Sequence, residues 1–328
     1  MALGMLVKKD VCESPIRKII YPIRIPTPFP VGDVNVYVIK DDKNVLVDTG
    51  PKTPEALETL KDGLYRIGLK FKDLDEIWLT HGHPDHFGLV KTIQQESDVI
   101  VFGHPDDNIN FDYNSQIPYF LSFFREHNLP EQYVSTFITQ FHWYGSYLDK
   151  IIPDVWFEDD TFMDTGNHRF QILHLPGHAS GHVGFWEETG VLLGGDVLIK
   201  HITSNALISF DENSGKRTDN LLLLRNSMQT VGEKAKCVLP GHGIIFKKAS
   251  EVAESHLEDQ EKRLDNVLRF LGEPQSLLRI TEQLFPIAEK PEMAFLPISE
   301  IIGYLDWGIR VRSMARFKDN GSWFYVKK

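Results

Sequence analysis

The chain has 328 residues, of which 42% are hydrophobic and 25% charged, and its formal net charge at pH 7 is −11. This length and composition are typical of a globular protein with one large domain or two unequal domains. The acidic balance argues against non-specific binding of nucleic acid by the molecule as a whole. The two cysteines, Cys12 and Cys237, exclude a disulfide scaffold and favour a reducing compartment.

The apolar residues form no run that is long enough to cross a membrane. No segment reaches the roughly 18–20 apolar residues of a transmembrane helix, and Lys8, Lys9 and Asp10 interrupt the N-terminal stretch early. We therefore expect a cytoplasmic protein with no membrane partner.

Strand and helix patterns alternate over the first hundred residues. Strands are predicted at 34–39, 45–47, 75–79 and 99–102 from their apolar or alternating pattern, and helices at 54–67 and 89–95 from the spacing of apolar residues. This alternation indicates α/β architecture.

Residues 105–150 break the alternation, because they are rich in aromatic side chains and predict two helices around Asn128-Leu129-Pro130. These aromatic side chains could simply pack the insertion against the main body. They could instead belong to a lid whose aromatic face lines a substrate pocket. The candidate pocket residues are Phe120, Phe124, Trp143, Tyr144 and Tyr147.

The pattern changes again after residue 248. Strands are predicted at 170–175, 182–186, 191–196 and 237–240 and a helix at 221–231, whereas residues 249–271, 275–285 and 293–307 predict three further helices. Two strands then flank Asp319-Asn320-Gly321, a strong signal for a type I′ hairpin. Three helices closed by a hairpin are the pattern of a winged helix, so we expect two domains, 1–248 and 249–328.

The stretch Thr80-His81-Gly82-His83-Pro84-Asp85-His86 places three imidazoles and a carboxylate in one short turn. Such nitrogen and oxygen donors suit Zn, Mn or Fe. Similar turns follow later strands at 176–182, 194–196 and 240–243, where glycine precedes a histidine or an aspartate. Glycine lets the backbone bend sharply, so that bulky ligands can converge.

Together these ordered motifs resemble the metallo-β-lactamase-fold hydrolases over roughly residues 20–248. The resemblance implies an αβ/βα sandwich with two metal ions at one edge of the paired sheets, and residues 105–150 would form a helical insertion in it. By this resemblance the first ion would be held by His81, His83 and His178, the second by Asp85, His86 and His242, and both by a bridging Asp196. Asp48 would support the site from behind the ligands, and His182 would be structural.

Two divalent ions, most readily zinc but also manganese or iron, would activate a bridging water as a hydroxide nucleophile, with Asp85 as the catalytic residue that orients it. This chemistry predicts hydrolysis of a small ester, thioester or lactone, with a small-molecule acyl compound as the partner. The motif at 176–182, followed by Val183-Gly184-Phe185, is similar to that of glyoxalase-type thioesterases. Class B β-lactamases usually carry a cysteine where this chain has Asp196, which argues against antibiotic hydrolysis.

Two other interpretations remain open. A metallo-β-lactamase domain followed by a winged helix resembles a branch that includes a single-strand endoribonuclease, and a phosphodiesterase could use the basic and aromatic wing to hold nucleic acid. The wing residues are Arg310, Arg312, Arg316, Trp323, Phe324, Tyr325, Lys318, Lys327 and Lys328. The aromatic side chains of the wing could equally pack on the three helices. Finally, the chain could be a regulatory module with little turnover, and the aromatic insertion could serve as a homodimer surface.

Overall fold

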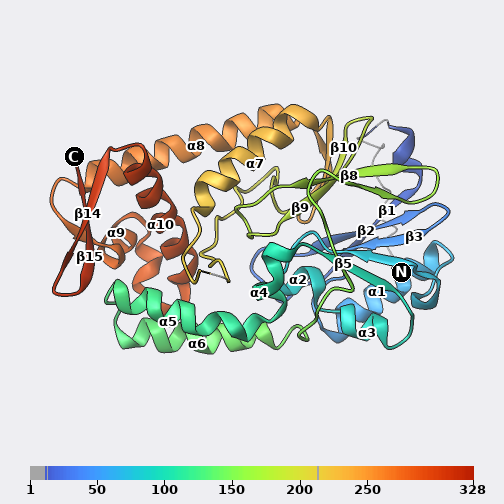
Figure 1. Ribbon diagram of the computed structural model, residues 1–328, viewed down its shortest axis with the longest axis horizontal. Helices are drawn as coiled ribbons and strands as arrows, with labels where there is room; N and C mark the ends of the chain where they lie inside the picture. The colour runs from blue at the N-terminus through green and yellow to red at the C-terminus, as the bar shows by residue number, and fades with distance from the viewer. Residues whose placement is uncertain (1–11, 13, 213) are drawn as a thin grey trace, which may run out of the picture.

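Two six-stranded β-sheets face one another in the part of the molecule drawn at the right of Figure 1. The computed structural model describes residues 12, 14–212 and 214–328. Residues 1–11 and 13 lie outside the described residues. They belong to the N-terminal stretch in which the sequence predicts no membrane-spanning run. This stretch belongs to the predicted domain 1–248, whose other residues are described except residue 213.

Each sheet uses strands that are neighbours in chain order. The first contains β1 (Ile20–Ile25), β2 (Val34–Lys40), β3 (Asn44–Val47), β4 (Glu76–Trp78), β5 (Ile100–Gly103) and β6 (Val155–Trp156). The second contains β7 (Phe162–Asp164), β8 (Arg169–His174), β9 (Val183–Glu187), β10 (Val191–Gly195), β11 (Cys237–Pro240) and β12 (Phe246–Lys247). The strands predicted at 34–39 and 45–47 are confirmed as β2 and β3, which pair antiparallel.

Two parallel strand pairs bring the polar motifs together. β3 runs parallel to β4, so the loops that carry Asp48 and His81 leave the first sheet side by side. β10 runs parallel to β11, so Asp196 and His242 leave the second sheet in the same way. The strand pairing therefore places the four motif residues at two pairs of neighbouring strand ends.

Side chains alternate between the two faces of each sheet, so each sheet packs against the other sheet on one face and against helices on the opposite face. On β3, Val45 and Val47 point into the core between the sheets, whereas Leu46 points to the opposite face. That face is covered by α1 (Pro54–Arg66) and α3 (Val90–Gln94), which contribute Leu60, Leu64 and Ile93 to the same cluster. The second sheet is covered on its outer face by α7 (Asn220–Lys234). The mixed α/β sandwich of two sheets with outer helices is thus confirmed.

The insertion contributes two helices, α5 (Ile117–Glu126) and α6 (Glu131–Gly145), to the lower edge of the molecule in Figure 1. It also contains α4 (Asn108–Phe111). Asn128 adopts a left-handed φ of 50° in the turn between α5 and α6. The predicted pair of helices around residues 128–130 is therefore confirmed.

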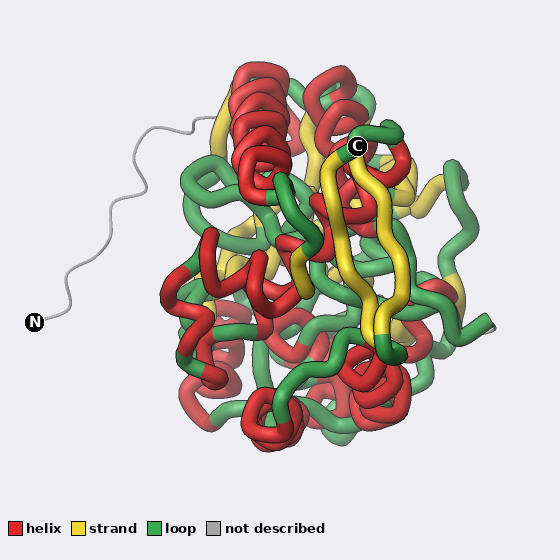
Figure 2. Tube along the Cα trace, turned by 90° about the vertical axis from the view of Figure 1, so that its left-hand side faces the viewer, coloured by secondary structure: helices red, strands yellow, loops and turns green. Residues whose placement is uncertain are grey.

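The C-terminal segment forms a small α/β unit at the left of Figure 1. It contains α8 (Ala249–Phe270), β13 (Gln275–Ser276), α9 (Leu277–Leu284), α10 (Phe295–Arg310), β14 (Met314–Asp319) and β15 (Ser322–Lys327). Its three strands are ordered β13-β15-β14, and the β14–β15 hairpin faces the viewer in Figure 2. Asn320 and Gly321 have φ of 48° and 85°, as a type I′ turn requires.

One hydrophobic core joins the insertion, the second sheet and the C-terminal segment. Phe120 and Phe137 of the insertion contact Phe295 of α10, while Leu224 of α7 belongs to the same cluster as Leu305. The packing is thus continuous across the predicted boundary at residue 248. Among the described residues, no helix has the length and apolar character needed to cross a membrane.

Candidate metal centre

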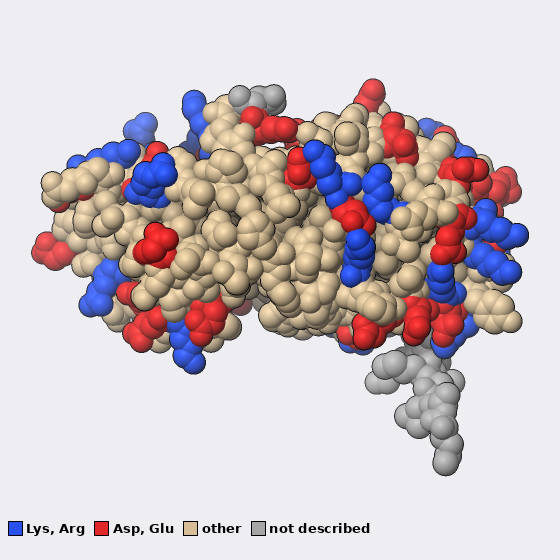
Figure 3. Space-filling model, turned by 90° about the horizontal axis from the view of Figure 1, so that it is seen from below, with Lys and Arg blue, Asp and Glu red and all other residues tan. Residues whose placement is uncertain are grey.

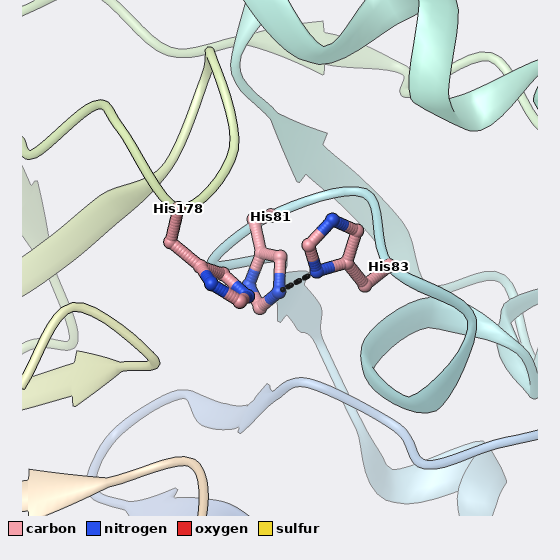
Figure 4. A group of neighbouring side chains, drawn as sticks. All are labelled: His81, His83 and His178. Carbon is pink, nitrogen blue, oxygen red and sulfur yellow. Dashed lines mark hydrogen bonds between the residues drawn. The ribbon is translucent and has the colours of Figure 1, made fainter. Parts of the chain in front are cut away.

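Loops from both sheets bring seven metal-competent side chains together at one edge of the sandwich. His81 and His83 follow β4, and the short helix α2 (Pro84–Phe87) presents Asp85 and His86. Figure 4 shows His178, from the loop after β8, beside His81 and His83. Among these seven side chains, three groups have ligand atoms close enough to share an ion: His81, His83 and His178; His81, His86 and Asp196; and Asp85, His86 and His242.

Three of the imidazoles are held in the same way, by an oxygen that faces Nδ1. The Nδ1 atom of His86 lies 2.8 Å from Oδ2 of Asp48, that of His178 lies 3.0 Å from the carbonyl oxygen of Asn205, and that of His242 lies 2.9 Å from the carbonyl oxygen of Asp33. An acceptor at Nδ1 fixes the proton on that nitrogen, so that in the neutral ring, the form that binds a metal, Nε2 carries the lone pair.

The free nitrogen atoms converge on the carboxylate of Asp196. The distances from its Oδ2 to Nε2 of His86, His178 and His242 are 3.6, 3.7 and 3.4 Å. These three nitrogens and Oδ1 of Asp196 are buried, and none has a hydrogen-bond partner among the described residues. Buried polar atoms without partners are costly, and divalent ions would satisfy all four. The residues present therefore fit a metal site.

His81 and His83 complete the first group through a close contact. Nε2 of His81 lies 2.9 Å from Nδ1 of His83, and Nδ1 of His81 lies 3.0 Å from the hydroxyl of Thr80. The Thr80 hydroxyl donates to Asp48 in turn, so it accepts from His81 and leaves Nε2 of that ring without a proton. Two ring nitrogens of the first group therefore face one another across a short gap.

Asp48 is central to the orientation of the ligands. Its backbone is in the left-handed region, at φ 60°, and its side chain is almost fully buried. The two carboxylate oxygens accept from the amide and the hydroxyl of Thr80, each at 2.8 Å, and one of them also faces His86. Asp48 is thus placed behind the ligands, where the sequence predicts it.

Burial and neighbouring charges shift the pKa values of the candidate ligands in opposite directions. Burial lowers the pKa of His86, but the carboxylates of Asp196 and Asp48 outweigh it and raise that pKa well above the ordinary value. Burial together with the surrounding imidazoles lowers the pKa of His81 well below the ordinary value. Burial raises the pKa of Asp85, but the imidazoles of His86 and His242 lower it to about 2. The carboxylate of Asp85 is therefore ionised at neutral pH.

A glycine in the last motif is required for the close approach of the ligands. A Cβ atom on Gly241 would lie 2.2 Å from Oδ1 of Asp196 and 2.9 Å from the ring of His86. No other residue leaves room for both. His182, predicted to be structural, accepts from the backbone amide of Asp196 through Nε2 and so fixes the start of that loop.

The sequence motifs did not identify Asp107, a fully buried carboxylate that connects two ligand loops. It accepts from the amide of Gly82 at 2.6 Å and from the amide of Gly181 at 2.7 Å, and Asn110 also donates to it. Burial raises the pKa of Asp107, although these hydrogen bonds lower it. Asp107 lies in the insertion and belongs to none of the metal motifs. Its role depends on its burial, which only the structure shows.

The five predicted pocket residues fall into two sets. Phe120 and Phe124 pack with Phe137 in the core between the insertion and the C-terminal segment and are almost fully buried. This differs from the pocket prediction, because core packing leaves these rings no surface for a ligand. The other three, Trp143, Tyr144 and Tyr147, surround Phe29 at 5.1–5.8 Å. Burial raises the pKa of Tyr144, and the charge of Asp85 adds to this effect.

A cavity of about 390 Å³ lies beside the ligands and was not predicted. Its wall includes Ser204 and Asn205, both of which contact His178, and His201, whose ring packs against Gly243. The opposite wall consists of residues from α8 and α10, among them Tyr304. The C-terminal segment thus closes a cavity next to the candidate metal centre.

The wing residues are largely engaged within the molecule. Tyr325 is fully buried, Arg310 pairs with Asp219, and the indole of Trp323 donates to Glu126. Arg316 and Lys318 lie over the ring of Trp323. On the face drawn in Figure 3, basic and acidic side chains of the described residues are interspersed and form no continuous basic tract.

The chain matches one family along most of its length. The sequence model of the metallo-beta-lactamase superfamily matches residues 29–242. The "Probable metallo-hydrolase YqjP" of Bacillus subtilis (strain 168) is 33% identical over 313 residues, which cover 87% of this chain and 90% of that protein. The "Hydroxyacylglutathione hydrolase GloC" of Haemophilus influenzae is 30% identical over 164 residues, 49% of this chain and 64% of that protein.

A solved structure shows the same fold over both the sandwich and the C-terminal segment. The metallo-beta-lactamase family protein TTHA1429 from Thermus thermophilus superposes with a TM-score of 0.82 at 24% sequence identity. The superposition covers 95% of this chain and 99% of that one. The fold shared with this structure therefore includes nearly the whole chain.

Proposed function

The chain belongs to the metallo-β-lactamase superfamily and is a metallo-hydrolase, and we propose that it is a binuclear enzyme acting on a small ester, thioester or lactone. The observation that carries this proposal is the set of buried Nε2 atoms of His86, His178 and His242 around Asp196, none of which has a described hydrogen-bond partner. Such a set costs stability unless it binds cations.

We assign the ligands to two ions by their grouping. His81, His83 and His178 would hold one ion, Asp85, His86 and His242 the other, and Asp196 would bridge them. Zinc suits these nitrogen and oxygen donors, and manganese and iron are the alternatives. When bound, the ions would lower the pKa of water and polarise a carbonyl oxygen.

Within this site Asp85 would act on the proton of the attacking water. Its carboxylate is ionised at neutral pH, and Oδ2 lies 3.2 Å from Nε2 of His242. Asp48, the carbonyl of Asn205 and the carbonyl of Asp33 would keep the imidazoles in one tautomer throughout the reaction. The chain thus supplies a proton acceptor in a fixed geometry.

We propose that the substrate lies between the 390 Å³ cavity and the aromatic cluster of Phe29, Trp143, Tyr144 and Tyr147. The cavity residues Ser204 and Asn205 contact His178, and the charge of Asp85 acts on Tyr144. The relative named hydroxyacylglutathione hydrolase supports a thioester among the candidates. The α-β-α-α-β-β order of residues 249–328 supports a winged-helix-like unit, which here would serve as a cavity wall. The homodimer stays a prediction.

A substrate screen tests this proposal. The purified, metal-loaded protein should hydrolyse p-nitrophenyl acetate or a small acyl thioester faster than bis-p-nitrophenyl phosphate or single-stranded RNA. Asp85→Ala should lower kcat by at least about 10²–10⁴-fold, the range for general acid–base catalysis, because it removes the proposed proton acceptor and a ligand of one ion together. Turnover of RNA or phosphodiester without carboxyl-ester turnover would contradict the substrate class. Unchanged rates in Asp85→Ala would contradict the role of Asp85.

A further inference from the structure

A second and larger cleft lies apart from the metal centre, between α5, Phe210 with residues 215–219, the end of α10 and the β14–β15 hairpin, which is in front in Figure 2. Its volume is about 810 Å³, and none of its described lining residues belongs to the candidate metal centre. Ligand sites for small molecules are about 300–1,000 Å³ in volume. The cleft is therefore large enough for a small organic molecule.

Basic side chains outnumber acidic ones around this cleft, although the whole chain has a net charge of −11. The basic lining residues are Lys216, Arg217, Arg310, Arg312 and Arg316, and the acidic ones are Glu126, Asp219 and Asp306. Arg217 is neutralised by Asp306, with Nη2 2.8 Å from Oδ1, and Arg310 is neutralised by Asp219.

Three cations in the cleft are left without an ion pair to a described carboxylate: Lys216, Arg312 and Arg316. The remaining acidic residue, Glu126, accepts from the indole of Trp323. Gathering like charges in one cleft is unfavourable unless an anion or solvent screens them. Guanidinium groups bind phosphate particularly well, because their planar N–H groups match its oxygens in pairs.

Arg312 occupies a backbone position at which glycine would make the protein more stable. α10 ends in a Schellman motif, in which the amide of Ser313 donates to the carbonyl of Gly308 and the amide of Arg312 to that of Ile309. Arg312 occupies the left-handed position of this motif with φ 60°. A side chain at this position is strained, and strained residues of this kind concentrate at functional sites.

Aromatic side chains line the same cleft. Tyr119 stacks on Phe210 at 5.5 Å, and the guanidinium of Arg316 lies 4.4 Å from the centre of the Trp323 ring. Aromatic rings of this kind stack on nucleobases, and a guanidinium beside them can hold the attached phosphate. The lining thus combines surfaces for both parts of a nucleotide.

We propose that this cleft binds a small organic phosphate of the nucleoside monophosphate class. The phosphate lies between Arg312, Arg316 and Lys216, and the base lies against Tyr119, because the ring of Trp323 is already covered by Arg316 and Lys318. The dianionic charge of a phosphate monoester at neutral pH matches three unpaired cations better than a monocarboxylate does. The site is independent of the metal centre, so binding needs no catalytic turnover.

Calorimetric titration of the full chain with AMP tests the proposal. AMP should bind with a dissociation constant below the millimolar range, and adenosine and orthophosphate should each bind at least tenfold more weakly. Arg312→Gly and Arg312→Gln should both weaken AMP binding at least tenfold. The matched control Arg279→Gln removes an exposed arginine of α9 that does not line the cleft, and should bind AMP like the wild type.

Thermal unfolding separates a binding role from a structural one. Arg312→Gly should have a Tm at or above that of the wild type, because glycine relieves the left-handed strain, yet it should bind AMP poorly. Absence of AMP binding at millimolar concentration would overturn the proposal, as would unchanged affinity in both Arg312 variants. Equal affinity for orthophosphate would overturn the assignment of the base to the aromatic side chains.

Discussion

Nδ1 of His86 lies 2.8 Å from a carboxylate oxygen of Asp48, which comes from a strand end 38 residues earlier in the chain. The same carboxylate accepts from the amide and hydroxyl of Thr80, directly before His81. One buried acid therefore sets the orientation of ligands in both proposed ion groups, and its loss should affect metal binding more than folding.

Asp48→Asn should weaken binding of the ion held by His86. The amide group of asparagine cannot accept from Nδ1 while also accepting twice from Thr80, so the imidazole is no longer fixed in the binding tautomer. Loss of such a partner typically lowers metal affinity about 10–100-fold. Competition with a chromophoric chelator measures the affinity. Asp62→Asn, at an exposed position of α1, is the control and should retain wild-type affinity.

Asp107→Ala should destabilise the loops that carry His81, His83 and His178. The change removes the acceptor of two buried amides, Gly82 and Gly181, and each unsatisfied group costs about 1–3 kcal/mol. Urea unfolding should therefore show a loss of roughly 2–6 kcal/mol for the two groups together. A midpoint equal to that of the wild type would show that these hydrogen bonds do not hold the loops.

Phe120→Ala and Trp143→Ala should have different effects, because Phe120 belongs to the buried aromatic set and Trp143 to the set around Phe29. Phe120 is buried against Phe124 and Phe137, and its truncation should cost about 3–5 kcal/mol of unfolding free energy. The side chain of Trp143 is 42% exposed, so its truncation should cost far less stability but raise KM for an acyl substrate. A large stability loss in Trp143→Ala with unchanged KM would contradict the proposed aromatic wall.

His127 should make stability depend on pH in the acid range. Burial between α5 and β15 lowers its pKa to about 4, although the hydrogen bond with the carbonyl of Phe123 raises it. The unfolded chain, with a pKa near 6.5, binds a proton first as pH falls. The contribution of His127 to the free energy of unfolding is therefore fully present above pH ~6.5. It declines as the pH falls to ~4, by at most about 3 kcal/mol.

Urea unfolding at pH 7 and pH 4.5 measures this contribution. The difference in stability between the two pH values should be smaller in His127→Gln than in the wild type. His142→Gln, at an exposed position of α6, provides the comparison and should retain the wild-type difference. Equal pH dependence in His127→Gln and the wild type would show that another group accounts for the acid sensitivity.

Much of the fold could be predicted because its signals are local. The alternation on β2 and β3, the helical spacing of 54–67 and the Asn320-Gly321 turn each depend on a few neighbouring residues. The two-residue strand β13, which pairs with β15, is too short to carry a pattern of its own. It was therefore not predicted.

The candidate site also contains residues with a local sequence signal and residues without one. The metal motifs combine unusual side chains with glycine within a few residues, so the sequence singles them out. Asp107, Asn205 and the cavity walls depend on contacts between distant segments and carry no local motif. Phe120 and Phe124 are four residues apart on one helical face, a spacing that fits core packing as well as a pocket.

Metal content per chain tests the central claim most directly. Elemental mass spectrometry of the wild type, after loading with zinc and removal of excess ion, should give two ions per chain. His242→Ala, which removes a ligand of only one proposed group, should give close to one ion per chain while remaining folded by circular dichroism. One ion in the wild type, or two in His242→Ala, would contradict a binuclear site built from these residues.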